Sequence, residues 1–179
     1  MKTAFLGASL AAIVGSVATA DVTYSFTNQT WMGFNFTEAY TAGSLSGTLT
    51  GATVNATLNA STNYTYADDL CVYVAGSPLA LGGALQCGGF SSLGAQRYSW
   101  ANGASNAPGT PVTGTVNFTP GLNMTGSTNS IWIGNGNGYP LASGTFTGSI
   151  TLLGVSAVPA PGAIALVGLA GLVGRRRRS

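Results

Sequence analysis

The spacing of apolar residues between residues 21 and 157 most constrains the fold. Nowhere in this span do apolar residues recur at helical spacing for three turns. Short runs rich in Thr, Val, Tyr and Phe alternate instead with Gly, Asn, Ser and Pro. This pattern is typical of many short β-strands joined by turns. It predicts strands at 22–27, 31–37, 45–60, 70–75, 85–89, 96–100, 112–118, 130–134 and 144–155.

Two of these segments alternate between apolar and polar side chains, as strands with one buried face do. Val54, Ala56 and Leu58 share one predicted face, and the three polar residues among them share the other. The segment 112–118 alternates in the same way. We therefore predict one all-β domain over residues 21–157, folded as an antiparallel β-sandwich of jelly-roll type.

Residues 1–20 have the three parts of a secretory signal peptide. Lys2 provides a positive n-region, residues 4–17 carry no charge, and Ala18-Thr19-Ala20 is a small-x-small cleavage site. We therefore expect the protein to be exported, with Asp21 as its mature N-terminus. An ordinary N-terminal core helix is the alternative.

The two cysteines, Cys71 and Cys87, are candidates for a disulfide. Neither has a second cysteine at two-residue spacing, and histidine is absent, so a metal site is disfavoured. Disulfides persist in exported proteins, and a Cys71–Cys87 bridge would close a loop of about 15 residues. We expect this bridge, with two buried free thiols as the alternative.

The formal net charge of +2 comes from the ends of the chain. Lys2 and the four terminal arginines account for five of the six basic residues, which leaves Arg97 against four acidic residues in the body, a net charge of −3. There is no basic patch with interleaved aromatic residues. We therefore expect no nucleic-acid partner.

The residue types present disfavour catalysis. Without histidine, Ser-His-Asp and Cys-His systems and the commonest general base are excluded. The acid–base couple that remains for glycoside hydrolysis is Glu38 with Asp68 or Asp69, and the sequence does not place them at the required separation of ~5–10 Å. We expect a protein without catalytic activity, and a carboxylate glycosidase is the alternative.

Asp68 and Asp69 lie just before an apolar strand. Their oxygens could bind Ca²⁺ together with nearby carbonyl groups, although the spacing of a dedicated calcium loop is not present. Adjacent acids are also typical of a turn, in which their side chains accept hydrogen bonds from backbone N–H groups. We favour the turn, so that no metal ligand and no cofactor other than such a calcium ion is expected.

Aromatic side chains could form a platform for stacking sugars, although in sandwiches they more often pack in the core. Trp132 lies between two isoleucines and should point away from both. Tyr139 follows an Asn-Gly turn at 135–138. We therefore name Trp132 and Tyr139, together with Asp68 and Asp69, as candidate ligand contacts.

The chain ends in a proline-containing motif, a short apolar segment and a cluster of positive charge. The motif is Val158, Pro159, Ala160, Pro161 and Gly162, the apolar segment is 163–174, and the cluster is Arg175, Arg176, Arg177 and Arg178. The arginines should stay on the cytoplasmic side of a membrane. A helix over residues 163–174 would be only about 18 Å long, against ~30 Å of hydrocarbon. We therefore expect a transient membrane anchor, with a permanent anchor as the alternative.

In that order at the end of the chain, these three parts resemble the PEP-CTERM sorting domain of exported bacterial proteins. The usual third residue of the motif is Glu, where this chain has Ala160. The Val-Pro-x-Pro-Gly form resembles that seen among planctomycete-like bacteria. The resemblance implies that an exosortase, an integral-membrane transpeptidase-like enzyme, recognises residues 158–162 and removes the tail. It also implies an association with extracellular polysaccharide, biofilm matrix or the cell surface.

The domain and its two terminal segments, 1–20 and 158–179, together predict a structural or adhesive protein of the cell surface or extracellular matrix. Extracellular polysaccharide is the expected partner. A discrete carbohydrate- or calcium-binding module is the alternative.

Overall fold

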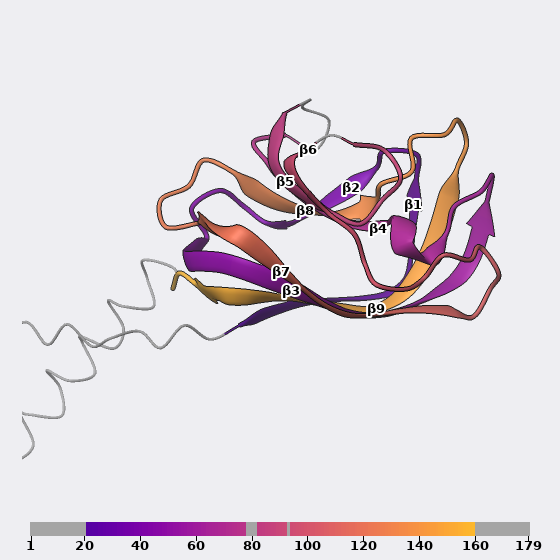
Figure 1. Cartoon of the computed structure of the whole chain (residues 1–179), viewed down its shortest axis with the longest axis horizontal. Coiled ribbons are helices and arrows are strands. Elements are labelled where there is room, and N and C mark those ends of the chain that lie inside the picture. Colours follow the sequence, from indigo (N-terminus) through magenta and orange to yellow (C-terminus); the bar gives the residue numbers. More distant parts are fainter. Residues whose placement is uncertain (1–20, 78–81, 93, 160–179) are drawn as a thin grey trace, which may run out of the picture.

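The structure of the protein, a computed structural model, describes residues 21–77, 82–92 and 94–159 (Figure 1). These residues form nine strands and one short 3-10 turn, η1 (Ala67–Asp69). The strands are β1 (Val22–Met32), β2 (Phe36–Tyr40), β3 (Leu45–Thr62), β4 (Leu70–Ala75), β5 (Gly83–Cys87), β6 (Gly94–Tyr98), β7 (Thr110–Asn123), β8 (Ser130–Asn135) and β9 (Ser143–Ala157). Within the described ranges, no helix has the length and apolar character needed to cross a membrane. The predicted signal peptide and the sorting segment from Ala160 onwards lie outside these ranges.

The strands form two sheets that pack face to face, as the predicted all-β sandwich requires (Figure 1). The first sheet has the strand order β1-β9-β3-β7, and the second has the order β2-β8-β4-β5-β6. Their shared core includes Trp31 and Phe146 from the first sheet and Leu85, Ile131 and Ile133 from the second. The strands of the first sheet alternate between core and solvent, because successive side chains of a strand point to opposite faces, whereas β4 in the second sheet is buried on both faces.

The long strand β3 shows this alternation as predicted. Val54, Ala56 and Leu58 are buried in the core, whereas Asn55 and Asn59 are exposed. β3 lies between β9 and β7 in the first sheet and pairs antiparallel with both. One face of the sheet is therefore packed on the core, and the other is open to solvent.

The predicted strand at 31–37 is wrong, because the chain turns in the middle of it. β1 ends at Met32 in the first sheet, and β2 begins at Phe36 in the second. Gly33 adopts a φ of +57° at this corner, which glycine accepts without steric cost, and its N–H donates to the Ala142 carbonyl at 2.6 Å. A glycine inside an apparent strand thus marks the crossing between the sheets.

The prediction of a purely antiparallel sandwich is wrong for the second sheet, because β5 and β6 run parallel. Their connection, residues 88–93, has only six residues. Parallel strands normally need a crossover of about a dozen residues or more. Both strands are short here, and carbonyls of residues 88 and 91 in the described part of the connection accept hydrogen bonds from side chains of β5 and β6.

The predicted disulfide between Cys71 and Cys87 is also wrong, since both cysteines are free and buried. Cys87 lies opposite Val72 and belongs to the core between the sheets, whereas Cys71 packs with Tyr73 on the outer face of the second sheet. Side chains on opposite faces cannot be bridged without moving the backbone. Burial raises the pKa of Cys87 to about 12 and also raises that of Cys71, so both remain unreactive thiols at neutral pH.

Candidate functional site

A cleft of about 670 Å³ lies at one end of the sandwich. The loops that form it connect β3 to β4, β5 to β6, β6 to β7 and β8 to β9. Both ends of the described chain lie at the opposite end of the sandwich (Figure 1), where the Gly154 N–H donates to the Asp21 carboxylate and the Val158 N–H donates to the Ser44 carbonyl. The cleft therefore faces away from both chain ends.

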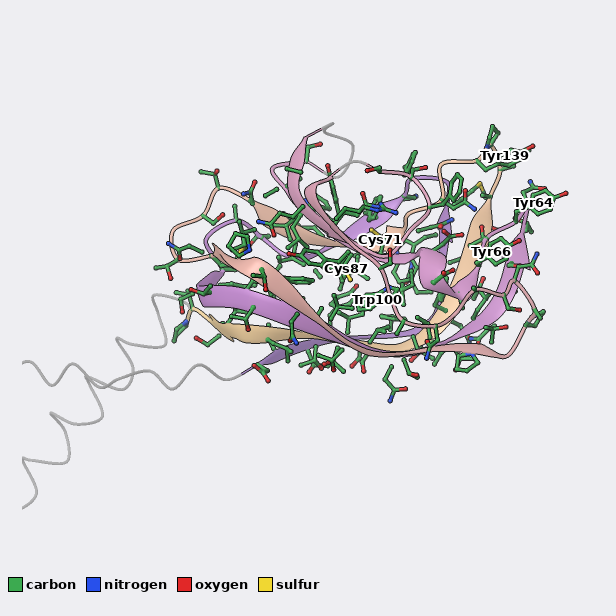
Figure 2. The ribbon with its side chains drawn as sticks, viewed as in Figure 1. Tyr64, Tyr66, Cys71, Cys87, Trp100 and Tyr139 are labelled. Atoms are coloured by element: carbon green, nitrogen blue, oxygen red, sulfur yellow. The ribbon has the colours of Figure 1, made fainter. Side chains whose placement is uncertain are left out.

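Four exposed aromatic side chains surround the cleft. The exposed fractions are 83% for Phe90, 66% for Tyr64, 56% for Tyr139 and 37% for Tyr66. The Tyr64 and Tyr139 rings meet edge to face, with centroids 6.2 Å apart (Figure 2). These four residues are called the aromatic rim below. Large apolar groups left in water are costly, so their concentration around one cleft points to a binding role.

The backbone that carries the rim is held in a strained conformation. Tyr64 has a φ of +63° and Asn63 has a φ of +45°, values that residues with a side chain rarely adopt. The amide of Asn137 donates to the Tyr64 carbonyl at 2.9 Å, and that of Asn63 donates to the Leu141 carbonyl at 3.1 Å. The β3–β4 and β8–β9 loops are thus tied to each other, and strain of this kind is concentrated at functional sites.

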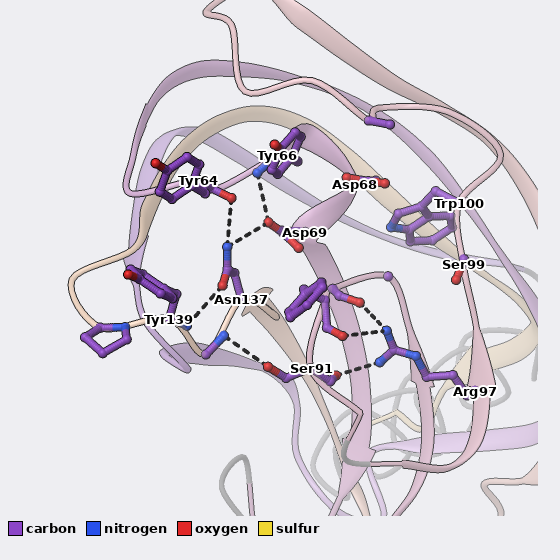
Figure 3. A pocket seen from close by; sticks show the side chains of 16 residues that line it. Tyr64, Tyr66, Asp68, Asp69, Ser91, Arg97, Ser99, Trp100, Asn137 and Tyr139 are labelled. Atoms are coloured by element: carbon purple, nitrogen blue, oxygen red, sulfur yellow. Dashed lines mark hydrogen bonds between the residues drawn. The ribbon is translucent and has the colours of Figure 1, made fainter.

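The buried Asp69 carboxylate connects these loops by hydrogen bonds. It is only 4% exposed, and its Oδ2 accepts hydrogen bonds from the Tyr66 N–H at 2.8 Å and from the Asn137 amide at 3.1 Å (Figure 3). The backbone N–H of Phe90 also donates to this carboxylate. Burial nevertheless raises the pKa of Asp69, with these hydrogen bonds opposing the shift. Asp69 is therefore a positioning residue that three loops share.

Asp68 differs from its neighbour because its carboxylate opens into the cleft. Figure 3 shows it between Tyr66 and Trp100. Among the described residues, its own backbone N–H is the hydrogen-bond donor that lowers its pKa, and burial raises that pKa by a larger effect. The side chain is thus half-buried and open toward the cleft, as a group that contacts a ligand would be.

The loop that presents Phe90 is fixed by two side chains that are paired in register, Gln86 on β5 and Arg97 on β6. The Gln86 amide donates to the carbonyls of Gly88 at 3.0 Å and Ser91 at 2.6 Å. The Arg97 guanidinium donates to Ser91 at 2.6 Å and also to the carbonyls of residues 89 and 90. These bonds satisfy the carbonyls of the short return and hold Phe90 in place while its ring stays exposed.

Trp100 closes the inner side of the cleft. Its ring is almost fully buried, and its indole N–H donates to the Leu70 carbonyl at 2.6 Å. A Cβ at Gly88 would lie 2.4 Å from the indole nitrogen, so only glycine fits against this ring. The cleft is therefore assembled from fixed parts rather than from free loops.

The structure brings together three of the four candidate ligand contacts named from the sequence. Asp68, Asp69 and Tyr139 line the cleft. Trp132 points away from the core as predicted, but it is half-buried on the outer face of the second sheet, where its indole N–H donates to the Ala75 carbonyl at 3.0 Å. Glu38 lies opposite Trp132 on β2 and does not line the cleft. Trp132 is thus a packing residue.

Sequence reasoning missed Phe90, Arg97 and Asn137 as parts of the site. Asn137 lies in the predicted Asn-Gly turn, where only the turn was visible. Gly88 and Gly89, the two glycines before Phe90, were predicted to end the strand at 85–89, whereas β5 ends at Cys87. Within the described residues, no three His, Cys, Asp or Glu side chains gather in a group able to hold a metal ion. No known family model, curated protein or solved structure matches the chain.

Proposed function

We propose that this protein is exported to the cell surface or extracellular matrix and binds a carbohydrate in the cleft, without catalysis. The aromatic rim around polar side chains is the observation that carries the proposal. The C–H faces of sugar rings stack on aromatic rings, while their hydroxyl groups bond to carboxylates and amides. Asp68, Ser91 and Ser99 line the same cleft and offer such groups.

The fixed geometry of the cleft supports binding. The Asp69, Asn137 and Arg97 bonds hold the rim before any ligand arrives. Binding therefore does not have to order these loops, and the entropy cost of association is reduced. An open cleft of this size is suited to several sugar units of a chain, as an adhesive or structural role in a polysaccharide matrix requires.

We further propose that the sandwich is a jelly roll. The orders β1-β9-β3-β7 and β2-β8-β4-β5 interleave early and late strands in both sheets, as two Greek keys do. β6 is then an addition at the edge, paired parallel to β5. Because β6 and its flanking connections carry Arg97, Phe90 and Trp100, the addition supplies one wall of the cleft.

The sorting proposal agrees with the position of the cleft. Under this proposal an exosortase-type enzyme recognises residues 158–162, and Arg175–Arg178 stay at the cytoplasmic face until the tail is removed. Val158, the first residue of the motif, lies with Asp21 at the end opposite the cleft. A chain held there would turn the aromatic rim outward. Mass spectrometry of the exported chain should find a mature form that starts at Asp21 and ends within residues 158–162.

The binding proposal is tested by affinity electrophoresis of the chain, purified from producing cells, through gels that contain soluble polysaccharides. We expect retardation in at least one gel, and a loss of about tenfold in affinity, ~1.4 kcal/mol, for Tyr64→Ala and for Tyr139→Ala. Met32→Ala, which truncates an exposed apolar side chain on β1 outside the cleft, is the matched control and should bind normally. Retardation that neither tyrosine substitution changes would contradict the proposal.

A further inference from the structure

The charged groups that line the cleft are not equally available to a ligand. They are Asp68, Asp69 and Arg97. The Asp69 carboxylate accepts from three N–H donors of the surrounding loops. The Arg97 guanidinium is surrounded by the carbonyls of residues 89–91, which accept its N–H groups. Asp68 is thus the charged group whose hydrogen-bonding capacity remains open to a ligand.

The aromatic rim, like the Asp68 carboxylate, favours a positively charged ligand. The faces of Tyr and Phe rings carry negative partial charge and attract cations within about 6 Å. Tyr66 and Trp100 flank the Asp68 carboxylate in Figure 3, and the rings of Tyr64, Tyr139 and Phe90 border the same cleft. Carboxylate and ring faces together form an environment for a positively charged group.

The rest of the domain reinforces this preference. Residues 21–157 contain one arginine, no lysine and four acidic residues, a net charge of −3. A polyanionic chain would be repelled by this charge and would bring like charges next to Asp68. A neutral chain would leave the desolvated Asp68 carboxylate without a charged partner.

We infer that the cleft selects a saccharide with free amino groups, whose ammonium lies between the Asp68 carboxylate and the aromatic rim. This inference rests on the carbohydrate-binding role proposed above and narrows it to one chemical class. Asp69 and Arg97 act in it only as positioning residues. Asp68 is the residue that determines specificity, because it supplies the charge that the ligand's ammonium meets.

The test compares three β-1,4-linked tetrasaccharides, of glucosamine, N-acetylglucosamine and glucuronic acid, by calorimetric titration of the full chain near pH 6 in low salt. We expect the glucosamine oligomer to bind at least about tenfold more tightly than the N-acetylated one, and the glucuronic acid oligomer to bind weakest. Asp68→Asn keeps the shape of the side chain and removes its charge. It should reduce the preference to within about threefold and leave the affinity for the N-acetylated oligomer unchanged.

Glu38→Gln is the matched control, since it removes the same charge on β2, outside the cleft. It should keep the preference. A thermal melt of Asp68→Asn should occur at a temperature no lower than that of the parent chain, because burial of the ionised Asp68 carboxylate opposes folding. Equal binding of the charged and neutral oligomers, or a preference that survives Asp68→Asn, overturns the inference and leaves carbohydrate binding intact. Binding of none of the three oligomers overturns the inference. If polysaccharide gels also fail to retard the chain, the proposed function is wrong as well.

Discussion

The outer face of the first sheet and the cleft are built from similar residue types in opposite ways. On the first sheet, hydroxyl groups pair with their neighbours on the next strand, as Thr53 does with Thr115 at 2.7 Å. In the cleft, one side chain can join several loops, as Asn137 does when its amide donates to Asp69 at 3.1 Å and to the Tyr64 carbonyl at 2.9 Å. The sheet face repeats one local contact many times, whereas the cleft depends on a few contacts that are each made once.

This difference determines how each region should respond to substitution. A hydroxyl pair on the sheet face can be lost without disturbing its neighbours, because water replaces it and the backbone ladder remains. A bond in the cleft cannot be replaced in this way, because its partners are buried and belong to several loops. Stability and binding should therefore be coupled in the cleft and independent on the sheet face.

The largest effect is expected for Asp69→Ala. The substitution removes the acceptor shared by the Tyr66 N–H, the Phe90 N–H and the Asn137 amide, which keeps only its bond to the Tyr64 carbonyl. We expect a loss of about 3 kcal/mol in the free energy of unfolding, measured by urea denaturation, together with loss of saccharide binding. Asp69→Asn, which keeps an oxygen acceptor, should lose less. A loss below about 1 kcal/mol for the alanine variant would show that the cleft network is as replaceable as the sheet face.

A smaller effect should follow from pH. Burial raises the pKa of both Asp68 and Asp69 above the ordinary value of 3.8, so the folded protein binds their protons more tightly than the unfolded chain does. For an acid with a raised pKa, the free energy of unfolding increases as pH falls through the folded pKa toward the ordinary value. Urea midpoints near pH 7 and near pH 4.5 measure this. A lower urea midpoint at the acidic pH in the parent chain would contradict the assignment of the pH effect to the raised pKa values of Asp68 and Asp69. So would an equally large rise of the midpoint in Asp69→Asn.

The smallest effect is expected on the sheet face. Thr53→Val and Thr115→Val each remove the 2.7 Å hydroxyl pair without changing side-chain volume much. We expect each to change the free energy of unfolding by less than about 0.5 kcal/mol and to leave saccharide binding as in the parent chain. A loss of about 2 kcal/mol in the free energy of unfolding, or a loss of saccharide binding, in either variant would show that the sheet face is as sensitive to substitution as the cleft.

The same contrast explains how much the sequence predicted. Strands depend on local alternation, and Val54, Ala56 and Leu58 predicted β3 because burial repeats every second residue. Each predicted strand overlaps an observed one. The errors arose where one residue changes the path, as at Gly33, or where strands that are near in sequence pair in an unusual direction, as β5 and β6 do.

The cleft could be predicted only in part, because it depends on which loops meet. Asp68 and Tyr139 were visible as unusual residues, but nothing local places residue 68 near residue 139. Arg97 illustrates the difficulty: its role comes from its register with Gln86 across a parallel pair that the sequence pattern does not indicate. The Cys71–Cys87 disulfide was predicted because disulfides persist in exported proteins, but no local signal in the sequence places the two side chains on opposite faces of the sheet.

The central position of β9 has a mechanical consequence. This 15-residue strand runs from the cleft end to the opposite end of the sandwich, hydrogen-bonded to β1 on one side and β3 on the other. A polysaccharide pulling at the cleft and a tether pulling beyond Ala157 would stretch the domain along β9. The ladder bonds lie across the strand, so this force loads them in shear and all at once. Rupture must then break many bonds together rather than open them one by one.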